Sequence, residues 1–142
     1  RKNHACCSGC PVAHALDIVG DRWTLLVLRQ IMFEGQHEYK EILQMPEGIA
    51  TNILCDRLCK LVCAEALGSI PHPTNKTKKL YYATEKGIAL IPVMKEMVIW
   101  AIDNDQNLPS HPKIEHFKSN QEEVINDVIK KIRQWNSEYQ VS

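Results

Sequence analysis

An apolar run over residues 12–33 limits the fold of this chain more than any other segment. It contains no proline, and Gly20 is its single glycine. Pro11, directly before the run, suits the first turn of a helix because a backbone N–H would have no intrahelical partner there. We therefore predict a short helix that ends at Gly20 and a second helix to about Phe33, with Asp21 as its N-cap. The second helix is apolar on most sides, which predicts a position in the centre of the core.

Apolar residues at helical spacing predict three further helices, over about residues 39–45, 50–66 and 84–102. Thr84 is expected to cap the third of them. The 50–66 helix has an apolar stripe on one side and a face of polar and thiol side chains about 100–180° away from it. That second face is expected to point away from the core.

Residues 67–71 and 79–83 have β character and flank a loop at 73–76, which predicts a hairpin. The net charge of the chain is zero, so a general attraction to polyanions is not expected and local charge has to supply any affinity for nucleic acid. The hairpin tip can do so, because it carries Lys76, Lys78 and Lys79.

The last third of the chain contains a proline-rich linker and one more helix. Ser119, followed three residues later by Glu122, predicts a capping box at the start of that helix. We expect a flexible tail over residues 1–9, a single domain over 10–105, a linker over 106–118 and a dimerisation helix over 119–142.

This order of elements is typical of a winged helix-turn-helix. The fold class is mainly α with a small β-hairpin wing (α+β), completed by C-terminal dimerisation helices. In such a fold the recognition helix enters the major groove and the wing reaches phosphates or the minor groove. No apolar stretch approaches the roughly 18 uncharged residues of a membrane span, so a cytoplasmic protein is expected. Its six cysteines then favour free thiols or metal ligands over disulfides.

Several short motifs occur in the order found in one family of bacterial regulators. They are Cys10-Pro11-Val12, the Gly20-Asp21-Arg22-Trp23-Thr24-Leu25-Leu26 stretch, Gly48-Ile49, Leu54-Cys55-Asp56-Arg57-Leu58 and Tyr82-Ala83-Thr84-Glu85-Lys86-Gly87. With these motifs, residues 10–101 resemble the HxlR-type transcriptional regulators, within the wider MarR-like winged-helix group. The resemblance implies a homodimeric DNA-binding regulator with a redox- or electrophile-sensitive cysteine at the position of Cys10.

The predicted recognition helix and wing supply the candidate DNA contacts. Asn52 is the expected base reader, because asparagine pairs bidentately with adenine. For Arg57 and Lys60, at the sides of the helix, a phosphate contact and an intramolecular ion pair both remain open. The wing lysines are expected to anchor phosphates. The candidate set is Thr51, Asn52, Cys55, Asp56, Arg57, Cys59, Lys60, Lys76, Lys78 and Lys79.

Cys10 is the candidate sensor, because a helix N-terminus and a nearby Arg or Lys favour the reactive thiolate. The alternative is a small buried hydrophobic residue. Cys6 and Cys7 would either resolve an oxidised Cys10, help to bind a metal, or belong to a mobile tail.

A second group of thiols, Cys55, Cys59 and Cys63, lies on the outward face of the 50–66 helix. Thiols four residues apart are neighbours on a helix and are able to share a soft metal, and a third thiolate would permit a metalloid. A regulator that senses soft metals or metalloids is therefore the alternative within the regulator class.

The terminal helix has a broader apolar stripe than one small core accepts. We predict that it forms a two-fold dimer interface with the 84–102 helix and the first helix, which would match a palindromic operator. The candidate interface residues are Val12, Leu16, Met97, Trp100, Val124, Val128, Ile132 and Trp135.

Together these features predict a dimeric transcriptional regulator, a repressor, whose affinity for operator DNA changes when an oxidant or electrophile modifies Cys10. No catalytic residue, cofactor or enzymatic activity is expected. A small thiol oxidoreductase around Cys7-x-x-Cys10 is less favoured, because it needs a βαβ context and the predicted strands are too few. A winged helix used for protein–protein contact is the third alternative.

Overall fold

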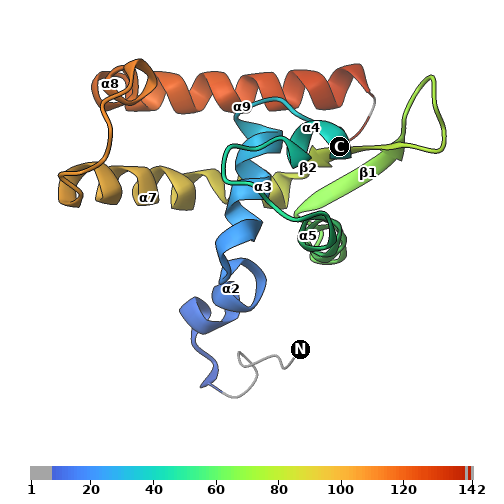
Figure 1. Ribbon diagram of the computed structural model, residues 1–142, viewed down its shortest axis with the longest axis horizontal. Helices are drawn as coiled ribbons and strands as arrows, with labels where there is room; N and C mark the ends of the chain where they lie inside the picture. Colours follow the sequence, from blue (N-terminus) through green and yellow to red (C-terminus); the bar gives the residue numbers. More distant parts are fainter. Residues whose placement is uncertain (1–7, 140, 142) are drawn as a thin grey trace.

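The structure, a computed structural model, describes residues 8–139 and 141 (Figure 1). Its main helices are α2 (Pro11–Val19), α3 (Arg22–Met32), α4 (Tyr39–Leu43), α5 (Thr51–Cys63), α6 (Glu85–Ile88), α7 (Ile91–Asn104), α8 (Pro112–Ser119) and α9 (Gln121–Glu138). Strands β1 (Leu67–Pro71) and β2 (Lys79–Ala83) form the wing. The predicted winged helix-turn-helix order is confirmed.

The break between α2 and α3 follows from two adjacent residues. A Cβ at Gly20 would lie 2.2 Å from the carbonyl oxygen of Leu16, so a larger residue does not fit at this helix end. Asp21 then caps α3, since its Oδ2 accepts hydrogen bonds from the backbone N–H of Trp23 at 3.0 Å and of Thr24 at 3.3 Å. The predicted N-cap is confirmed, and it fixes the direction in which α3 enters the core.

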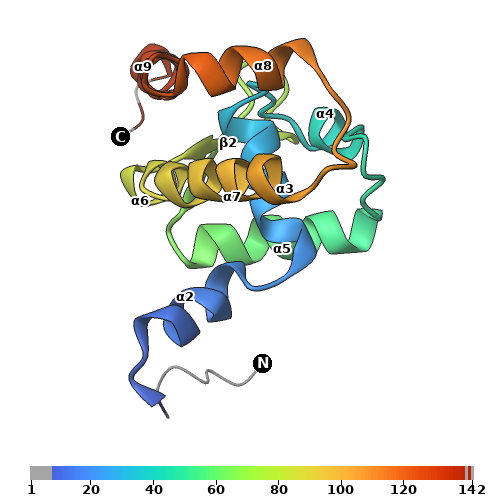
Figure 2. The same ribbon diagram turned by 90° about the vertical axis from the view of Figure 1, so that its left-hand side faces the viewer.

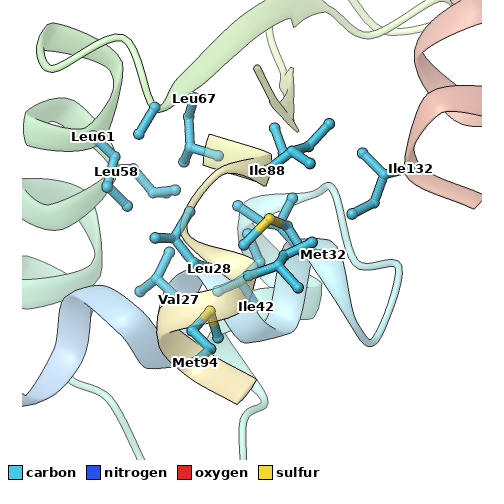
Figure 3. Packing of buried hydrophobic residues seen from close by; sticks show 14 of the residues in the cluster. Val27, Leu28, Met32, Ile42, Leu58, Leu61, Leu67, Ile88, Met94 and Ile132 are labelled. Carbon is cyan, nitrogen blue, oxygen red and sulfur yellow. The ribbon is translucent and has the colours of Figure 1, made fainter. Parts of the chain in front are cut away.

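Helix α3 is the centre of the core, as its apolar sequence predicts. Its Val27 and Leu28 are fully buried. Figure 3 shows how side chains from distant segments converge on them, including Ile42, Leu58, Leu61, Leu67, Ile88, Met94 and Ile132. The helix-turn-helix, the wing and α7 are thus held by one hydrophobic cluster, with α8 and α9 at one end of the molecule and α2 at the other (Figure 2).

The wing has the strand limits that the sequence predicts. β1 and β2 pair antiparallel from Leu67 opposite Ala83 to Pro71 opposite Lys79. At the tip, Nδ1 of His72 accepts hydrogen bonds from the backbone N–H of Thr74 and Asn75, both at 3.2 Å. These bonds order the loop that carries the lysines.

Three details of the C-terminal half differ from prediction. The expected 84–102 helix is split into α6 and α7, because Pro92 lies in the first turn of α7 and cannot continue a preceding helix. The expected linker contains α8, which starts at Pro112 with the side chain of His111 as its cap. Ser119 ends α8, so the predicted capping box with Glu122 is wrong; Asn120 is the N-cap residue of α9.

Helix α9 packs on the base of the wing within its own chain. The Trp135 indole stacks on His37 at a centroid distance of 3.9 Å and on Tyr139 at 4.1 Å. His37 Nδ1 lies 2.7 Å from the carbonyl oxygen of Tyr81 in β2. Ile132 is 8% exposed and belongs to the core. Ile132 and Trp135, predicted at a dimer interface, therefore have their contacts inside the chain.

Among the described helices, none combines the length and the apolar character that crossing a membrane requires.

Candidate nucleic-acid interface

The helix-turn-helix is held together by short polar contacts. Glu38 and Glu41 form a reciprocal capping box at the start of α4. The hydroxyl of Tyr39 donates a 3.0 Å hydrogen bond to the carbonyl oxygen of Thr51, the first residue of α5. The two helices therefore keep a set angle, which determines how α5 is presented to a ligand.

The turn between α4 and α5 is tied to α3 by an ion pair. Arg29 binds both carboxylate oxygens of Glu47, at 2.6 Å and 2.7 Å. The hydrogen bonds from Arg29 lower the pKa of Glu47 from 4.5 to about 2, against the opposing effect of burial. A bidentate pair of this kind fixes orientation as well as distance. The turn is thus anchored to the central helix of the core.

Helix α5 has two distinct faces. Leu54, Leu58 and Leu61 are buried against the core. The predicted reading face is exposed, and it consists of Thr51, Asn52, Cys55, Asp56, Cys59 and Lys60. In a helix-turn-helix, the outer face of the second helix lies where side chains read base edges in the major groove. The polar and thiol side chains of α5 lie on that face. Contact of each residue with DNA remains a prediction.

Arg57 and Lys60 form the intramolecular ion pairs that the sequence left open. Arg57 Nε donates to Asp21 Oδ2 at 2.7 Å, and its Nη1 donates to Asp56 Oδ2 at 2.5 Å. Lys60 Nζ lies 3.1 Å from the same Asp56 oxygen. Burial alone would raise the pKa of Asp21, but hydrogen bonds from Arg57, Thr24 and Trp23 outweigh it and lower the pKa to about 2. The carboxylate of Asp56 on the reading face is thereby neutralised by two cations.

The wing lysines have a different setting. Lys76, Lys78 and Lys79 are exposed. In the part of the chain that the structure describes, none of the nine ion pairs involves them. Lys78 and Lys79 line a hollow of about 360 Å³ between the wing and α4. Three amines without a carboxylate partner are free to bind phosphates.

Tyr81 is a residue of this surface that the sequence analysis did not single out. Burial raises the pKa of its phenol, and nearby Cys55, Cys59 and Tyr39 raise it further. Tyr81 of the wing is therefore within electrostatic reach of two of the three thiols of α5. No sequence signal marks this relationship, because it links the wing to the recognition helix through the tertiary fold.

Cys10 is the N-cap residue of α2 and is exposed. It lines a cavity of about 450 Å³ together with Pro11, His14, Ile18, Lys86 and Leu90, among others. The cavity lies between α2 and the start of α6 and α7, and most of its lining is apolar. The alternative of a Cys10 buried within the chain does not hold, since its side chain is exposed. Cys6 and Cys7 lie outside the described residues.

Apolar side chains are exposed on α7 and also on α2. Trp100 is 69% exposed, Met97 53% and Val12 67%, and Leu16 is exposed as well. On α7, Val93, Met97 and Trp100 border one shallow groove. Val124 and Val128 of α9, also predicted at the interface, are half-buried. Exposed aromatic and aliphatic side chains in such a patch are typical of protein interfaces.

A match to a known family decides the classification. Residues 18–109 match the family model described as HxlR-like helix-turn-helix. The chain belongs to this family. The HxlR-like resemblance stated from the motifs is confirmed, and with it the class of the protein as a DNA-binding transcriptional regulator.

Individual members of the family agree with this assignment. The HTH-type transcriptional regulator YodB of Bacillus subtilis (strain 168) is 34% identical over 93 residues, which cover 65% of this chain and 82% of YodB. The reduced form of YodB superposes with a TM-score of 0.56 at 32% identity, over 68% of this chain and 95% of that one. PA1607, a candidate transcription factor, gives a TM-score of 0.68 at 34% identity over 78% of this chain and 75% of that chain. YodB has also been solved in diamide-treated and quinone-bound forms.

Proposed function

We propose that this HxlR-like regulator is a dimeric repressor that binds a palindromic operator and releases it when an electrophile or oxidant modifies Cys10. The observation that carries the proposal is the position of Cys10, an exposed thiol at a helix N-terminus that borders a cavity of about 450 Å³. A thiol in such a setting is accessible to a small reactive molecule, which the cavity has room to hold.

DNA binding is proposed to use two elements. The exposed face of α5 enters the major groove, with Asn52 reading an adenine, and the wing lysines contact phosphates. Arg57 serves chiefly to hold α5 on α3 through Asp21 at 2.7 Å. Lys60 is free to exchange its Asp56 partner for a phosphate, because that pair is exposed and therefore weak.

The dimer is proposed to form through the exposed apolar side chains of α7 and α2. Trp100 and Met97 provide exposed apolar area on α7, and Val12 and Leu16 provide it on α2. Two-fold symmetry would place two α5 helices on successive major grooves of one face of the duplex. This arrangement accounts for apolar side chains that the chain leaves exposed.

The switch links these two surfaces. The Cys10 thiolate adds to an electron-poor ring carbon of a quinone; an S–C bond forms and the ring takes up the proton, which gives a hydroquinone thioether. The adduct would occupy the cavity beside Lys86 and Leu90 and displace α2 from α6 and α7. Since α2 also carries interface residues, the distance between the two α5 helices would change. The related protein YodB has been solved in reduced, diamide-treated and quinone-bound forms, which supports oxidants and quinones as the class of inducer in this proposal.

The test is footprinting on the DNA that flanks the chain's own coding region. Reduced protein should protect a palindromic site, and treatment with a quinone should abolish the protection. A C10S variant should protect the same site before and after treatment. Loss of protection by the treated C10S variant would assign the response to another thiol.

The other functions receive less support. Among the described residues, no group of three His, Cys, Asp or Glu side chains is arranged to hold a metal ion. The sheet of the described residues is one antiparallel pair, which does not provide the βαβ context of a thioredoxin-like oxidoreductase.

A further inference from the structure

The three thiols of α5 form an exposed row on the recognition helix. Cys55, Cys59 and Cys63 are all exposed, whereas the leucines of the same helix are buried. Side chains four residues apart on a helix have Cβ atoms about 6 Å apart. Cys55 and Cys63 are separated by about 12 Å along the axis, at about 1.5 Å per residue. Cys59 is therefore the neighbour of both other thiols, which are too far apart to share one ligand atom.

The surroundings of Cys59 also place it between two sites. Cys59 and Cys63 line a hollow of about 320 Å³ between α5 and α2, with Lys60 and Asp56 at its edge. Cys55 and Cys59 lie one turn apart and are both exposed. The Cys59–Cys63 pair thus has a hollow beside it for a small bound group, and the Cys55–Cys59 pair lies on the open face of the helix.

The number of protein ligands near the α5 thiols decides which kind of metal or metalloid they suit. No set of three His, Cys, Asp or Glu side chains within the described residues fits a metal ion. Two neighbouring thiols without a third protein ligand suit a soft three-coordinate atom that already has one covalent substituent. A trivalent organic arsenical has this composition, because its arsenic binds one carbon and two sulfur atoms.

We propose that Cys59 is the shared member of two overlapping dithiol sites, Cys55–Cys59 and Cys59–Cys63, that bind a trivalent organic arsenical on the DNA-reading face. The regulatory part of this inference rests on the proposed function. Two As–S bonds form and two As–O bonds break. The thiol protons leave with the arsenic-bound oxygens as water, and arsenic remains trivalent, so no oxidant is needed.

The position of the adduct explains its effect. At Cys55–Cys59 the arsenical and its substituent cover the face that carries Asn52 and Asp56. The protein cannot bind the arsenical and the major groove at the same time, and by thermodynamic linkage DNA protects the thiols to the same degree. This release acts directly on the recognition helix and does not require Cys10 or a change in the dimer.

The first experiment measures the sites without DNA. The background is a C6S/C7S/C10S variant, so that the α5 thiols are the remaining cysteines. Reduced protein is titrated with phenylarsine oxide and examined by intact-protein mass spectrometry and thiol counting. We expect one phenylarsenic group and the loss of two thiols per chain in the background and after addition of either C55S or C63S. Addition of C59S should weaken binding about 100-fold, because the chelate advantage is lost. Equal binding by the C59S protein, or no bound arsenical in the background, would overturn the proposal.

The second experiment uses the operator found by footprinting, or random-sequence duplex DNA at low salt if no operator is found. In the background and C63S proteins, one equivalent of phenylarsine oxide should release DNA, and ethane-1,2-dithiol should restore the complex. DNA should slow the reaction of both proteins with the arsenical. If the arsenical binds but the reduced chain binds no DNA, the proposed function fails while the dithiol sites stand. If DNA stays bound to the fully modified protein, the regulatory part is wrong.

Discussion

Arg57 Nε donates a 2.7 Å hydrogen bond to Asp21 Oδ2, so the recognition helix is bonded to the N-cap of the central helix of the core. The same carboxylate accepts the capping hydrogen bonds from Trp23 and Thr24. One side chain thus starts α3 and positions α5. The interior and the reading face are coupled at this residue.

Replacement of this shared carboxylate should be costly. We expect D21A to lower the free energy of unfolding by about 2 kcal/mol, because a capping residue and an ion-pair partner are lost together. Urea denaturation followed by circular dichroism measures the change. The matched control is D103A, an exposed aspartate of α7, which should stay within about 0.5 kcal/mol of the parent. A D21A protein as stable as D103A would contradict the role of the cap.

The Arg29–Glu47 pair predicts a specific loss of stability in acid. The pKa of Glu47 falls from 4.5 to about 2 on folding, chiefly through its hydrogen bonds to Arg29. A carboxyl group whose pKa is lowered by folding stabilises the fold at pH values above its pKa in the unfolded chain. This contribution disappears as the pH falls through the pKa of the group in the folded chain. The difference in unfolding free energy between the parent and R29Q should therefore be constant above about pH 5 and shrink between pH 4.5 and 2. A difference that does not change over this range would contradict the pair.

The wing lysines should contribute affinity without sequence preference. A K76A/K78A/K79A variant should bind all duplexes more weakly, and the slope of log Kd against log salt should fall by about 2–3, since each phosphate contact contributes about 0.9. Fluorescence anisotropy over a range of salt concentrations measures both quantities. Lys118, Lys130 and Lys131, on the α8–α9 side of the molecule (Figure 1), are the matched control set for alanine substitution. Equal salt slopes for the two triple variants would show that the wing does not contact phosphates.

The α7 surface predicts the oligomeric state. A W100E variant should be monomeric at protein concentrations at which the parent is dimeric, because a charge would enter the centre of an apolar interface. Sedimentation velocity distinguishes the two. Q44E introduces the same charge at the exposed C-cap of α4 and should leave the assembly unchanged. If the W100E protein is dimeric, the dimer interface lies on another surface of the chain.

An aromatic stack contributes to the docking of α9, together with Ile132 in the core. W135A should destabilise the chain by about 2–3 kcal/mol, because the indole that lies between His37 and Tyr139 is removed. W135F should cost less, since a ring remains in the stack. Thermal unfolding of the two variants provides the comparison. If W135A and the parent unfold at the same temperature, α9 contributes nothing to the fold through this contact.

Local physical chemistry explains the parts of the fold that could be predicted. Asp21 and Thr84 are caps because their side chains bond to amides two or three residues away. The wing strands, Leu67–Pro71 and Lys79–Ala83, have the predicted limits because turn residues between them define the hairpin. The error at Ser119 is of the same local kind, since His111 and Pro112 start a helix where a linker was expected.

The exposed face of α5 was also predictable, because helical spacing separates its leucines from its polar residues. The sequence did not predict which cationic side chains remain available to DNA. The sequence left an ion pair and a phosphate contact open for Arg57, and in the structure Arg57 is paired with Asp21 and Asp56, whereas the wing lysines have no carboxylate partner among the described residues. Asp21 is distant from Arg57 in the sequence, and no periodicity reports this pair.

By itself, the sequence determined the helix starts as far as Thr84, the hairpin, the two faces of the recognition helix and the HxlR-like family, since each depends on contacts within a few residues or on short motifs. The tertiary structure decided which apolar residues are exposed. Trp100 and Trp135 both lie in apolar helical stripes, but Trp135 stacks on His37 whereas Trp100 is 69% exposed. The physical reason is that burial depends on which distant segment packs on a helix, and a helix's own sequence does not contain that information.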